Sequence, residues 1–220
     1  MPGENLKFAD EFAAEYDHSI LNNNWNGPQF MFESVKDRII TNSKVLDLGI
    51  GTGESSRRFH EAGHTITGID GSANMLKQCM NKKISSELVH HDLEIIPYPI
   101  ENDLFDAIIS NGVFHLVNPV KPIFSEVKRM LKPGGIFAFT YEDSENTEGS
   151  HEIEPGVWQL TANSGVLSFK HDNNYIKDLL RLYKFDIILK KQFLAFVNQQ
   201  SNTEFYFTLM VAQLRSYSPH

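Results

Sequence analysis

The sequence predicts an α/β fold in which helices flank a mostly parallel β-sheet. From Lys44 to Glu142, short apolar runs alternate with amphipathic stretches, which is the pattern of parallel strands joined by crossover helices. A glycine-rich turn, Gly49–Gly53, separates the first of these strands from the helix that follows it. Near the C-terminus, a short polar connection joins two β-rich runs, 185–197 and 203–213. This arrangement predicts an antiparallel hairpin.

Two helices are expected ahead of the sheet. Apolar residues fall at helical spacing from Leu6 to Asp17 and again from about Gln29 to Ile40. The asparagine-rich segment Asn22–Pro28 between them is a loop by composition, and Thr41–Ser43 separates the second helix from the first strand. Residues 1–43 are therefore interpreted as an N-terminal helical cap.

The alternation that follows, residues 44–142, forms the core of the predicted sheet. Ser72 is expected to be the N-cap of its second helix, and Gly63 ends the first. Pro133–Gly135 is expected to form a turn into the last strand. In chain order the expected strands are Lys44–Ile50, His64–Asp70, Ser86–Asp92, Phe105–Leu116 and Ile136–Glu142, and the expected helices are Glu54–Gly63, Ser72–Lys83 and Val120–Leu131.

Residues 143–170 depart from this alternation. The stretch Asp143–Asn163 is polar and acidic and contains Trp158, so it is predicted to be an inserted loop or lid, with a short strand at Val166–Phe169. Residues 171–220 add a helix from about Asn173 to Tyr183 and the hairpin, with His171 as a candidate cap of that helix. The whole chain, 1–220, is expected to be a single domain.

Composition excludes several classes of function. With 41% hydrophobic and 22% charged residues, the chain has the composition of an ordinary soluble globular protein. Its 20 basic and 28 acidic residues give a net charge of -8, which disfavours nucleic acid and anionic membrane as partners. Cys79 is the only cysteine, so no internal disulfide or thiolate cluster can form. The sequence has no apolar leader and no apolar run near the ~20 residues of a membrane span, and a cytoplasmic location is expected.

The glycine-rich turn predicts a ligand that approaches the backbone closely. Glycine has no Cβ, and such a turn aims the first amide groups of the following helix at a ligand. Asp70 ends the next strand, about twenty residues further on, where a carboxylate can accept hydrogen bonds from two ribose hydroxyls. Adenosine is therefore expected to be part of the ligand.

Three ligand classes contain adenosine and use a turn of this kind. A dinucleotide site needs a third glycine where Glu54 stands, and this carboxylate would repel a pyrophosphate. A nucleoside triphosphate site needs a Gly-Lys-Ser/Thr ending that this turn lacks. S-adenosylmethionine carries a sulfonium cation and no phosphate, so acidic neighbours such as Asp47 and Glu54 suit it best.

Five motifs resemble those of the class I S-adenosylmethionine-dependent methyltransferases. "VLDLGIGTG" and "TGID" resemble the family's first two motifs, and "HHDLEIIPYP", "FDAIISNGVFHLV" and "MLKPGGIFAFT" follow in the family's order. The resemblance covers Lys44 to Thr140. Within the family, the chain most resembles the small-molecule UbiE/BioC-like group. It implies a doubly wound, Rossmann-like, seven-stranded sheet with an antiparallel C-terminal strand, and S-adenosyl-L-methionine as the cofactor.

The resemblance also implies roles for individual residues. Asp47 would reach the methionine amino group, Asp70 the ribose diol, and Asp92 the adenine amine. Leu93 would offer its backbone amide and an apolar surface to the ring, and Tyr16 would lie over the cofactor unless it is simply a packed aromatic. The remaining implied cofactor contacts are Gly49, Gly51 and Gly53 under the methionine and ribose, Gly71, Ser72 and Met75 beside the adenine, and Ser110 and Asn111 at the methionine.

Methyl transfer needs alignment of donor and acceptor more than it needs a nucleophilic residue. If the acceptor is a hydroxyl or an ammonium, a general base assists, and His115 at the end of a strand is the first candidate. The alternative for His115 is a structural or pocket-lining role. Tyr141 and Glu142 are the next candidates. His90 and His91 flank Asp92 without a recognisable third metal ligand, so no metal is expected.

The acceptor is expected to be a small molecule held by segments outside the shared core, including Trp25, Trp158 and Phe169. The two tryptophans could equally be core residues. The identity of the acceptor and the oligomeric state do not follow from the sequence. A non-catalytic sensor of S-adenosylmethionine or S-adenosylhomocysteine is the main alternative function, and a nicotinamide oxidoreductase is a more distant one.

Overall fold

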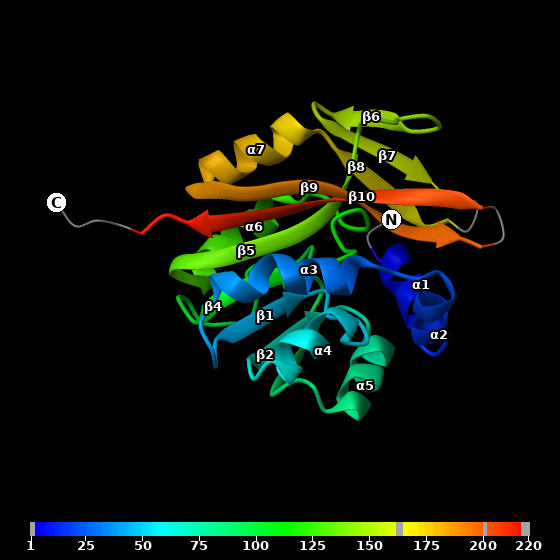
Figure 1. The fold of residues 1–220 in the computed structure, drawn as a ribbon. Coiled ribbons are helices and arrows are strands. Elements are labelled where there is room, and N and C mark those ends of the chain that lie inside the picture. The colour runs from blue at the N-terminus through cyan, green and yellow to red at the C-terminus, as the bar shows by residue number, and fades with distance from the viewer. Residues whose placement is uncertain (1–2, 162–164, 200–201, 217–220) are drawn as a thin grey trace.

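The computed structural model describes residues 3–161, 165–199 and 202–216. Figure 1 shows a central sheet with helices on both faces, as the sequence predicts. The helices are α1 (Glu4–Phe12), α2 (Tyr16–Asn22), α3 (Gly27–Val35), the short 3-10 helix η1 (Lys36–Arg38), α4 (Glu54–Glu61), α5 (Ala73–Lys82), α6 (Lys121–Met130) and α7 (Asn173–Leu182). The strands are β1 (Lys44–Leu48), β2 (Thr65–Asp70), β3 (Glu87–His90), β4 (Phe105–Ser110), β5 (Leu131–Asp143), β6 (His151–Glu154), β7 (Val157–Thr161), β8 (Leu167–His171), β9 (Phe185–Asn198) and β10 (Thr203–Leu214).

The strands form one sheet with the predicted doubly wound topology. Strands β1 to β5 are parallel in the order β3-β2-β1-β4-β5, and the chain reverses direction across this sheet between β1 and β4. Strand β10 pairs antiparallel with β5, and β9 pairs antiparallel with β10. The predicted C-terminal hairpin is therefore confirmed, and the β1/β4 reversal places a binding crevice at the carboxyl ends of the parallel strands.

Within the described residues the sheet has ten strands, three more than the seven that the family resemblance implies. These three are β6, β7 and β8, which extend the sheet from the end of β5, where Glu142 and Asp143 pair with Lys170 and His171. Strand β8 overlaps the short strand predicted at Val166–Phe169. The segment Asp143–Asn163, predicted to be a loop, thus contains a β-hairpin within its described part. All four residues of β6 are exposed and only Val157 of β7 is fully buried, so neither strand has the apolar alternation that identifies a strand in sequence.

Three other elements differ from the predicted ones. The first helix is divided into α1 and α2 by the turn Ala13–Glu15, and the second ends in the 3-10 helix η1. Pro133–Gly135 is not a turn outside the sheet, because β5 runs through it with a register shift against β4. A Cβ on Gly135 would lie 2.9 Å from the Lys132 carbonyl oxygen and 3.2 Å from that of Asp106, so the backbones meet too closely there for a side chain.

Two apolar cores lie on opposite faces of the sheet. On one face, Met31 and Val35 of α3 and Phe59 of α4 pack against Val45 of β1. On the other face, α6 and α7 cover Leu46 and Leu48 through a cluster rich in phenylalanine. The alternation of Val45, Leu46 and Leu48 between these cores follows from the period of a strand. It also turns Asp47 toward α4, away from the phenylalanine cluster.

The N-terminal helix α1 lies across the edge where the parallel strands end (Figure 1). The Asp10 carboxylate accepts hydrogen bonds from Ser72 Oγ at 2.6 Å and from the Asn74 backbone amide at 2.9 Å, at the start of α5. At the other end of α1, Asn5 Nδ2 donates to the carbonyl oxygens of Leu116 and Leu167, and Asn5 Oδ1 accepts from the Leu167 amide. The helix is thus tied to both sides of the crevice.

Phe124 of α6 is the residue whose truncation is expected to destabilise the fold strongly. Its side chain is fully buried, with ring centroids 5.5 Å from Phe137 and 5.4 Å from Phe139. Phe124→Ala should lower the free energy of unfolding by about 3–5 kcal/mol, because it leaves a cavity in a close-packed core. Chemical denaturation measures this. Leu182→Ala, at a side chain that is 55% exposed, is the matched control, and equal losses in both variants would contradict the described packing.

Asp10→Ala is expected to loosen α1 without unfolding the sheet. Losing the bonds to Ser72 and Asn74 frees the middle of α1 from α5, whereas the sheet core keeps all its contacts. Hydrogen exchange should become severalfold faster in residues 4–12 and stay unchanged in β1 and β4. Glu11→Ala removes a neighbouring exposed carboxylate whose nearest cation is 3.9 Å away and should leave the exchange unchanged. Equal protection in both variants would show that Asp10 does not hold the helix.

Candidate cofactor and acceptor site

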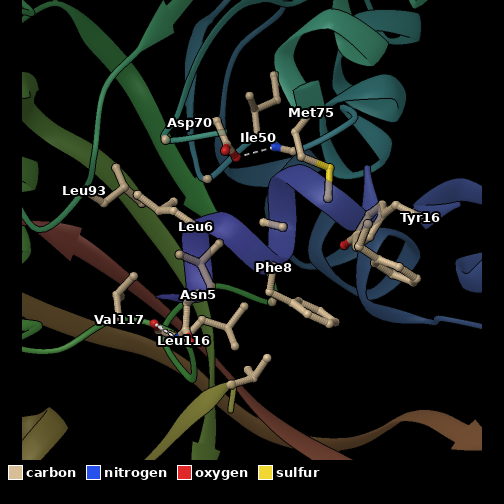
Figure 2. Close-up of a pocket in the computed structure, with 18 of the residues that line it drawn as sticks. Asn5, Leu6, Phe8, Tyr16, Ile50, Asp70, Met75, Leu93, Leu116 and Val117 are labelled. Atoms are coloured by element: carbon tan, nitrogen blue, oxygen red, sulfur yellow. Dashed lines mark hydrogen bonds between the residues drawn. The ribbon is translucent and has the colours of Figure 1, made fainter. Parts of the chain in front are cut away.

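A cavity of about 400 Å³ lies at the carboxyl ends of the parallel strands, beneath α1. Its lining comes from the turns after β1, β2, β3 and β4 and from α1, α2 and the segment before β8. In Figure 2, α1 runs between Asp70 and Met75 on one side and Leu116 and Val117 on the other. The volume lies in the range of pockets that enclose a small ligand.

The glycine turn after β1 contributes backbone to the cavity wall. Gly51 has a φ of +53°, and a Cβ built there meets nothing within 4 Å, so its backbone faces open space. Gly53 has a φ of +90° and precedes α4, but a Cβ there would lie 2.3 Å from Ile84 Cδ1. Gly49 and Gly51 line the cavity and Gly53 does not. The last glycine of the ladder is therefore required by packing against Ile84.

Asp70 joins two of the turns that line the cavity. Its Oδ2 accepts a hydrogen bond from the Gly51 amide and its Oδ1 accepts one from the Ser72 amide, both at 2.8 Å. Burial raises the pKa of this carboxyl, and the two amide bonds act in the opposite direction. Each carboxylate oxygen keeps a free lone pair, so Asp70 can accept two further hydrogen bonds from a diol in the cavity.

The predicted adenine contacts lie together on the next part of the wall. Gly71, Met75, Asp92 and Leu93 all line the cavity. A Cβ on Gly71 would lie 2.5 Å from Leu6 Cδ2, so α1 packs directly over this glycine. Ser72, by contrast, does not line the cavity: its hydroxyl donates to Asp10 and accepts from the Met75 amide as the predicted N-cap of α5.

The wall after β4 is fixed by hydrogen bonds of Asn111. Asn111 lines the cavity, its Nδ2 donates to Ser55 Oγ at 2.9 Å, and its Oδ1 accepts from Thr140 Oγ1 at 3.1 Å. Ser110 lies behind this wall, where its hydroxyl donates to the Leu48 carbonyl oxygen. Sequence reasoning grouped Ser110 with Asn111, and the structure brings only Asn111 to the cavity.

Asp47 lies directly behind the glycine turn. It is fully buried, and its carboxylate accepts a hydrogen bond from Ser56 Oγ at 2.7 Å. Burial raises the pKa of Asp47 to about 7, against the effect of the Ser56 bond. Asp47 does not line the cavity, so direct contact with a ligand is not part of this geometry. The protonation state of Asp47 instead sets the electrostatic potential beneath the turn, which is more negative when the carboxyl is ionised.

Tyr16 lies at the start of α2 and lines the cavity. Burial, and then the charge of Asp70, raise the pKa of its hydroxyl to about 12. Tyr16 is therefore neutral across the physiological range and cannot act there as an anion. Its ring also packs edge-on against Phe12, with centroids 6.1 Å apart, so both interpretations of this residue, cofactor contact and packed aromatic, remain compatible with its position.

None of the three candidate bases, His115, Tyr141 and Glu142, lines the cavity. Tyr141 is fully buried in β5, and its hydroxyl donates to Asn173 Oδ1 at 2.7 Å. The His115 ring packs 4.9 Å from that of Phe207, and burial lowers the pKa of His115 to about 4. Its Nδ1 is enclosed with no hydrogen-bond partner among the described residues. Asp172 caps α7, so the predicted cap role of His171 is wrong.

Sequence reasoning missed most of the apolar wall. Phe8 and Phe12 of α1 line the cavity with Leu116 and Val117 after β4. The helical spacing of the two phenylalanines was visible in the sequence, but which face would cover a ligand was not. Trp25 and Phe169, expected near an acceptor, do line this cavity, whereas Trp158 lines a separate groove beside α7.

These residues can hold S-adenosylmethionine. The open backbone at Gly51, the free lone pairs of Asp70 and the apolar surface of Leu93 and Met75 match the ribose and adenine parts of that molecule. No lysine, arginine or histidine lines the cavity within the described part of the chain, which suits a ligand with a sulfonium cation and does not suit one with a pyrophosphate.

Comparison with known proteins agrees with this geometry. Residues 46–139 match the family model of a methyltransferase domain. The malonyl-[acyl-carrier protein] O-methyltransferase of Salmonella typhimurium is 35% identical over 62% of this chain and 50% of its own length. The Buchnera aphidicola protein of that name is also 35% identical, over 45% of this chain and 39% of its own. The chain thus spans half or less of these relatives.

Solved structures agree on the fold. An S-adenosylmethionine-dependent methyltransferase from Methanosarcina mazei superimposes with a TM-score of 0.69 at 16% identity, covering 84% of this chain and 98% of that one. One from Mesorhizobium loti gives 0.64 at 20% identity, covering 83% and 96%. Residues 46–139 therefore match a methyltransferase domain in sequence, and the solved structures show the same fold over most of the chain.

Proposed function

We propose that this protein is an enzyme that transfers the methyl group of S-adenosylmethionine to a small-molecule acceptor. The observation that carries the proposal is the position of Asp70, whose carboxylate links the Gly51 and Ser72 amides at 2.8 Å each and still faces the cavity. This arrangement presents two hydrogen-bond acceptors beside an open backbone, as a ribose diol requires.

The residues divide by role along the cavity. In this proposal Asp70 binds the ribose, Gly49 and Gly51 underlie the ribose and methionine, and Asn111 lies at the methionine end. Asp92, Leu93, Gly71 and Met75 surround the adenine, and Tyr16 closes the site from α2. Four residues act from behind the wall. Gly53 allows the turn to pack against Ile84, and Ser72 caps α5. Ser110 bonds β4 to β1, and Asp47 sets the electrostatic potential under the turn.

The protein's contribution to catalysis is placement and exclusion of water. When bound, S-adenosylmethionine supplies an electrophilic methyl group that an acceptor lone pair takes in line, with the carbon–sulfur electron pair returning to sulfur. Helix α1 covers the cavity through Asp10 and Asn5, which keeps donor and acceptor dry and aligned. His115 and Tyr141 stay predictions as bases, and the proposed mechanism does not need them.

The names of the relatives suggest a carrier-bound acceptor. The Salmonella typhimurium and Buchnera aphidicola relatives are named as methyltransferases of malonyl-[acyl-carrier protein]. Their similarity to this chain covers less than two thirds of their length. The parts of the cavity wall that come from α1 and from the segment before β8 lie outside residues 46–139. The proposal therefore concerns the methyl transfer and leaves the acceptor to the residues of that wall.

Labelled S-adenosylmethionine and a metabolite extract test the proposal. We expect label to pass into a small product, and S-adenosylhomocysteine to bind in calorimetry. Asp70→Ala should weaken that binding at least tenfold, because charge-assisted hydrogen bonds are lost, and should reduce transfer accordingly. Glu11→Ala, on the exposed face of α1, is the control. Tight binding without any transfer would instead indicate a sensor, and unchanged affinity in Asp70→Ala would refute the ribose contact.

Asp47 predicts a pH dependence of cofactor affinity. Since the pKa of Asp47 is raised to about 7, the group is largely protonated at pH 6 and ionised at pH 8. A cationic ligand favours the ionised form, so affinity for S-adenosylmethionine should rise as the pH increases through 7 and level off above it. Calorimetry from pH 6 to pH 8 measures the rise. Asp47→Asn, which fixes the group as neutral, should flatten the profile, and an equally steep profile in that variant would assign it to another group.

A further inference from the structure

The charged residues that line the cavity are all acidic. They are Glu54, Asp70, Asp92 and Glu94, and no basic side chain joins them within the described residues. Glu54 is neutralised, because Lys82 Nζ lies 2.7 Å from its Oε1 and Arg57 pairs with its Oε2. The other three carboxylates have no Lys or Arg partner within the described part of the chain. Their charges remain inside the cavity.

This charge exceeds what the cofactor needs. S-adenosylmethionine carries a sulfonium, an ammonium and a carboxylate, so its net charge near neutral pH is one positive unit. In the proposed binding mode Asp70 and Asp92 accept hydrogen bonds from the ribose and the adenine, which are neutral groups. The three carboxylates without a cationic partner therefore leave the cavity negative after the cofactor binds. A second molecule entering the cavity meets a potential that attracts cations and repels anions.

The rest of the acceptor wall is mainly apolar and aromatic, and the amides of Asn118 and Gln159 are its polar members. Phe8 and Phe12 of α1, Trp25, and Phe169 at the end of the wall line the cavity together with Leu116 and Val117. Aromatic faces bind organic cations through their quadrupoles, most strongly where water is excluded. Asn5 adds no free polar group there, since its side chain already bonds Leu116 and Leu167.

We propose that the methyl acceptor is a basic amine carried on an apolar, ring-sized framework, and that the cavity rejects carboxylates. This inference rests on the proposed methyltransferase function and deepens it. It sets this chain apart from relatives named for malonyl-[acyl-carrier protein], because a free carboxylate would have to enter a cavity lined by carboxylates. An ammonium ion, by contrast, is attracted both by the lining carboxylates and by the aromatic faces of the wall.

The reaction with an amine also needs no histidine. The amine arrives as an ammonium ion and first loses one proton to water or to a lining carboxylate. The neutral nitrogen lone pair then forms the nitrogen–carbon bond while the carbon–sulfur bond breaks, giving an N-methylammonium and a thioether. One positive charge is present before and after this transfer, so the acidic wall stabilises both sides of it. The proton released in the first step is the only other product.

Three probes that share the naphthalene ring system test the proposal: 1-naphthylmethylamine, 1-naphthylmethanol and 1-naphthoate. Each is titrated by calorimetry with and without S-adenosylhomocysteine. We expect the amine to bind at least tenfold more tightly than the carboxylate, with the alcohol between them. A carboxylate that binds as tightly as the amine would overturn the proposal, and an alcohol that binds more tightly than the amine would overturn the choice of nitrogen.

Glu94→Gln tests the source of this preference. Glu94 Oε1 accepts from the Asn118 amide at 3.1 Å, and glutamine retains that oxygen while it removes the charge. The amine-to-carboxylate ratio should fall at least threefold in Glu94→Gln and stay unchanged in Glu101→Gln, at an exposed glutamate outside the cavity. An unchanged ratio in Glu94→Gln would overturn the electrostatic argument. Failure of S-adenosylhomocysteine to bind would count against the methyltransferase function alone, because the probe order is also measured without it.

Discussion

The Asp70 carboxylate is the interaction on which the site depends. Asp70 is the last residue of β2 and lies at the edge of the sheet. Its carboxylate accepts hydrogen bonds from the Gly51 and Ser72 amides, which join the end of β2 to the glycine turn and to the start of α5. Two loops that are far apart in sequence are thereby held in one orientation. A carboxylate at this point serves the fold first, since it accepts backbone donors that would otherwise be left without partners, and its remaining lone pairs are then available to a ligand.

The same logic extends to the cover of the cavity. Asp10 of α1 bonds Ser72 and Asn74, so the start of α5 is held by Asp70 from the sheet and by Asp10 from the cap. These hydrogen bonds lower the pKa of Asp10, with that from Ser72 acting most strongly. Leu6 packs over Gly71 because glycine leaves room for it. Cover and wall are therefore one connected structure, and a ligand under α1 is enclosed by contacts that exist without it.

Among the described residues, no helix is both long and apolar enough to cross a membrane.

The sequence predicted the parts of the molecule that repeat a local rule. The parallel strands, the Ser72 cap and the C-terminal hairpin follow from periodicity and capping chemistry. Strands β6 and β7 were not predicted, because β6 is exposed throughout, β7 buries only Val157 fully, and neither has apolar alternation. Of the site, the glycine turn and Asp70 were expected to face a ligand from their position at strand ends, and Asp92 from the family resemblance; all three line the cavity, and their roles stay predictions. Ser110 was misplaced because a one-residue step along the chain decides whether a side chain faces the cavity or the neighbouring strand.

Among the described residues no histidine lines the cavity, and the acidic wall offers an electrostatic reason for this. A histidine in this cavity would have to stay neutral to act as a base, but carboxylates nearby favour its charged form. His115 avoids that conflict by packing against Phe207, where burial lowers its pKa to about 4. In the described geometry a cavity lined by carboxylates suits a cationic donor and an acceptor that supplies its own lone pair. The electrostatics that favour the cofactor therefore also narrow the choice of acceptor.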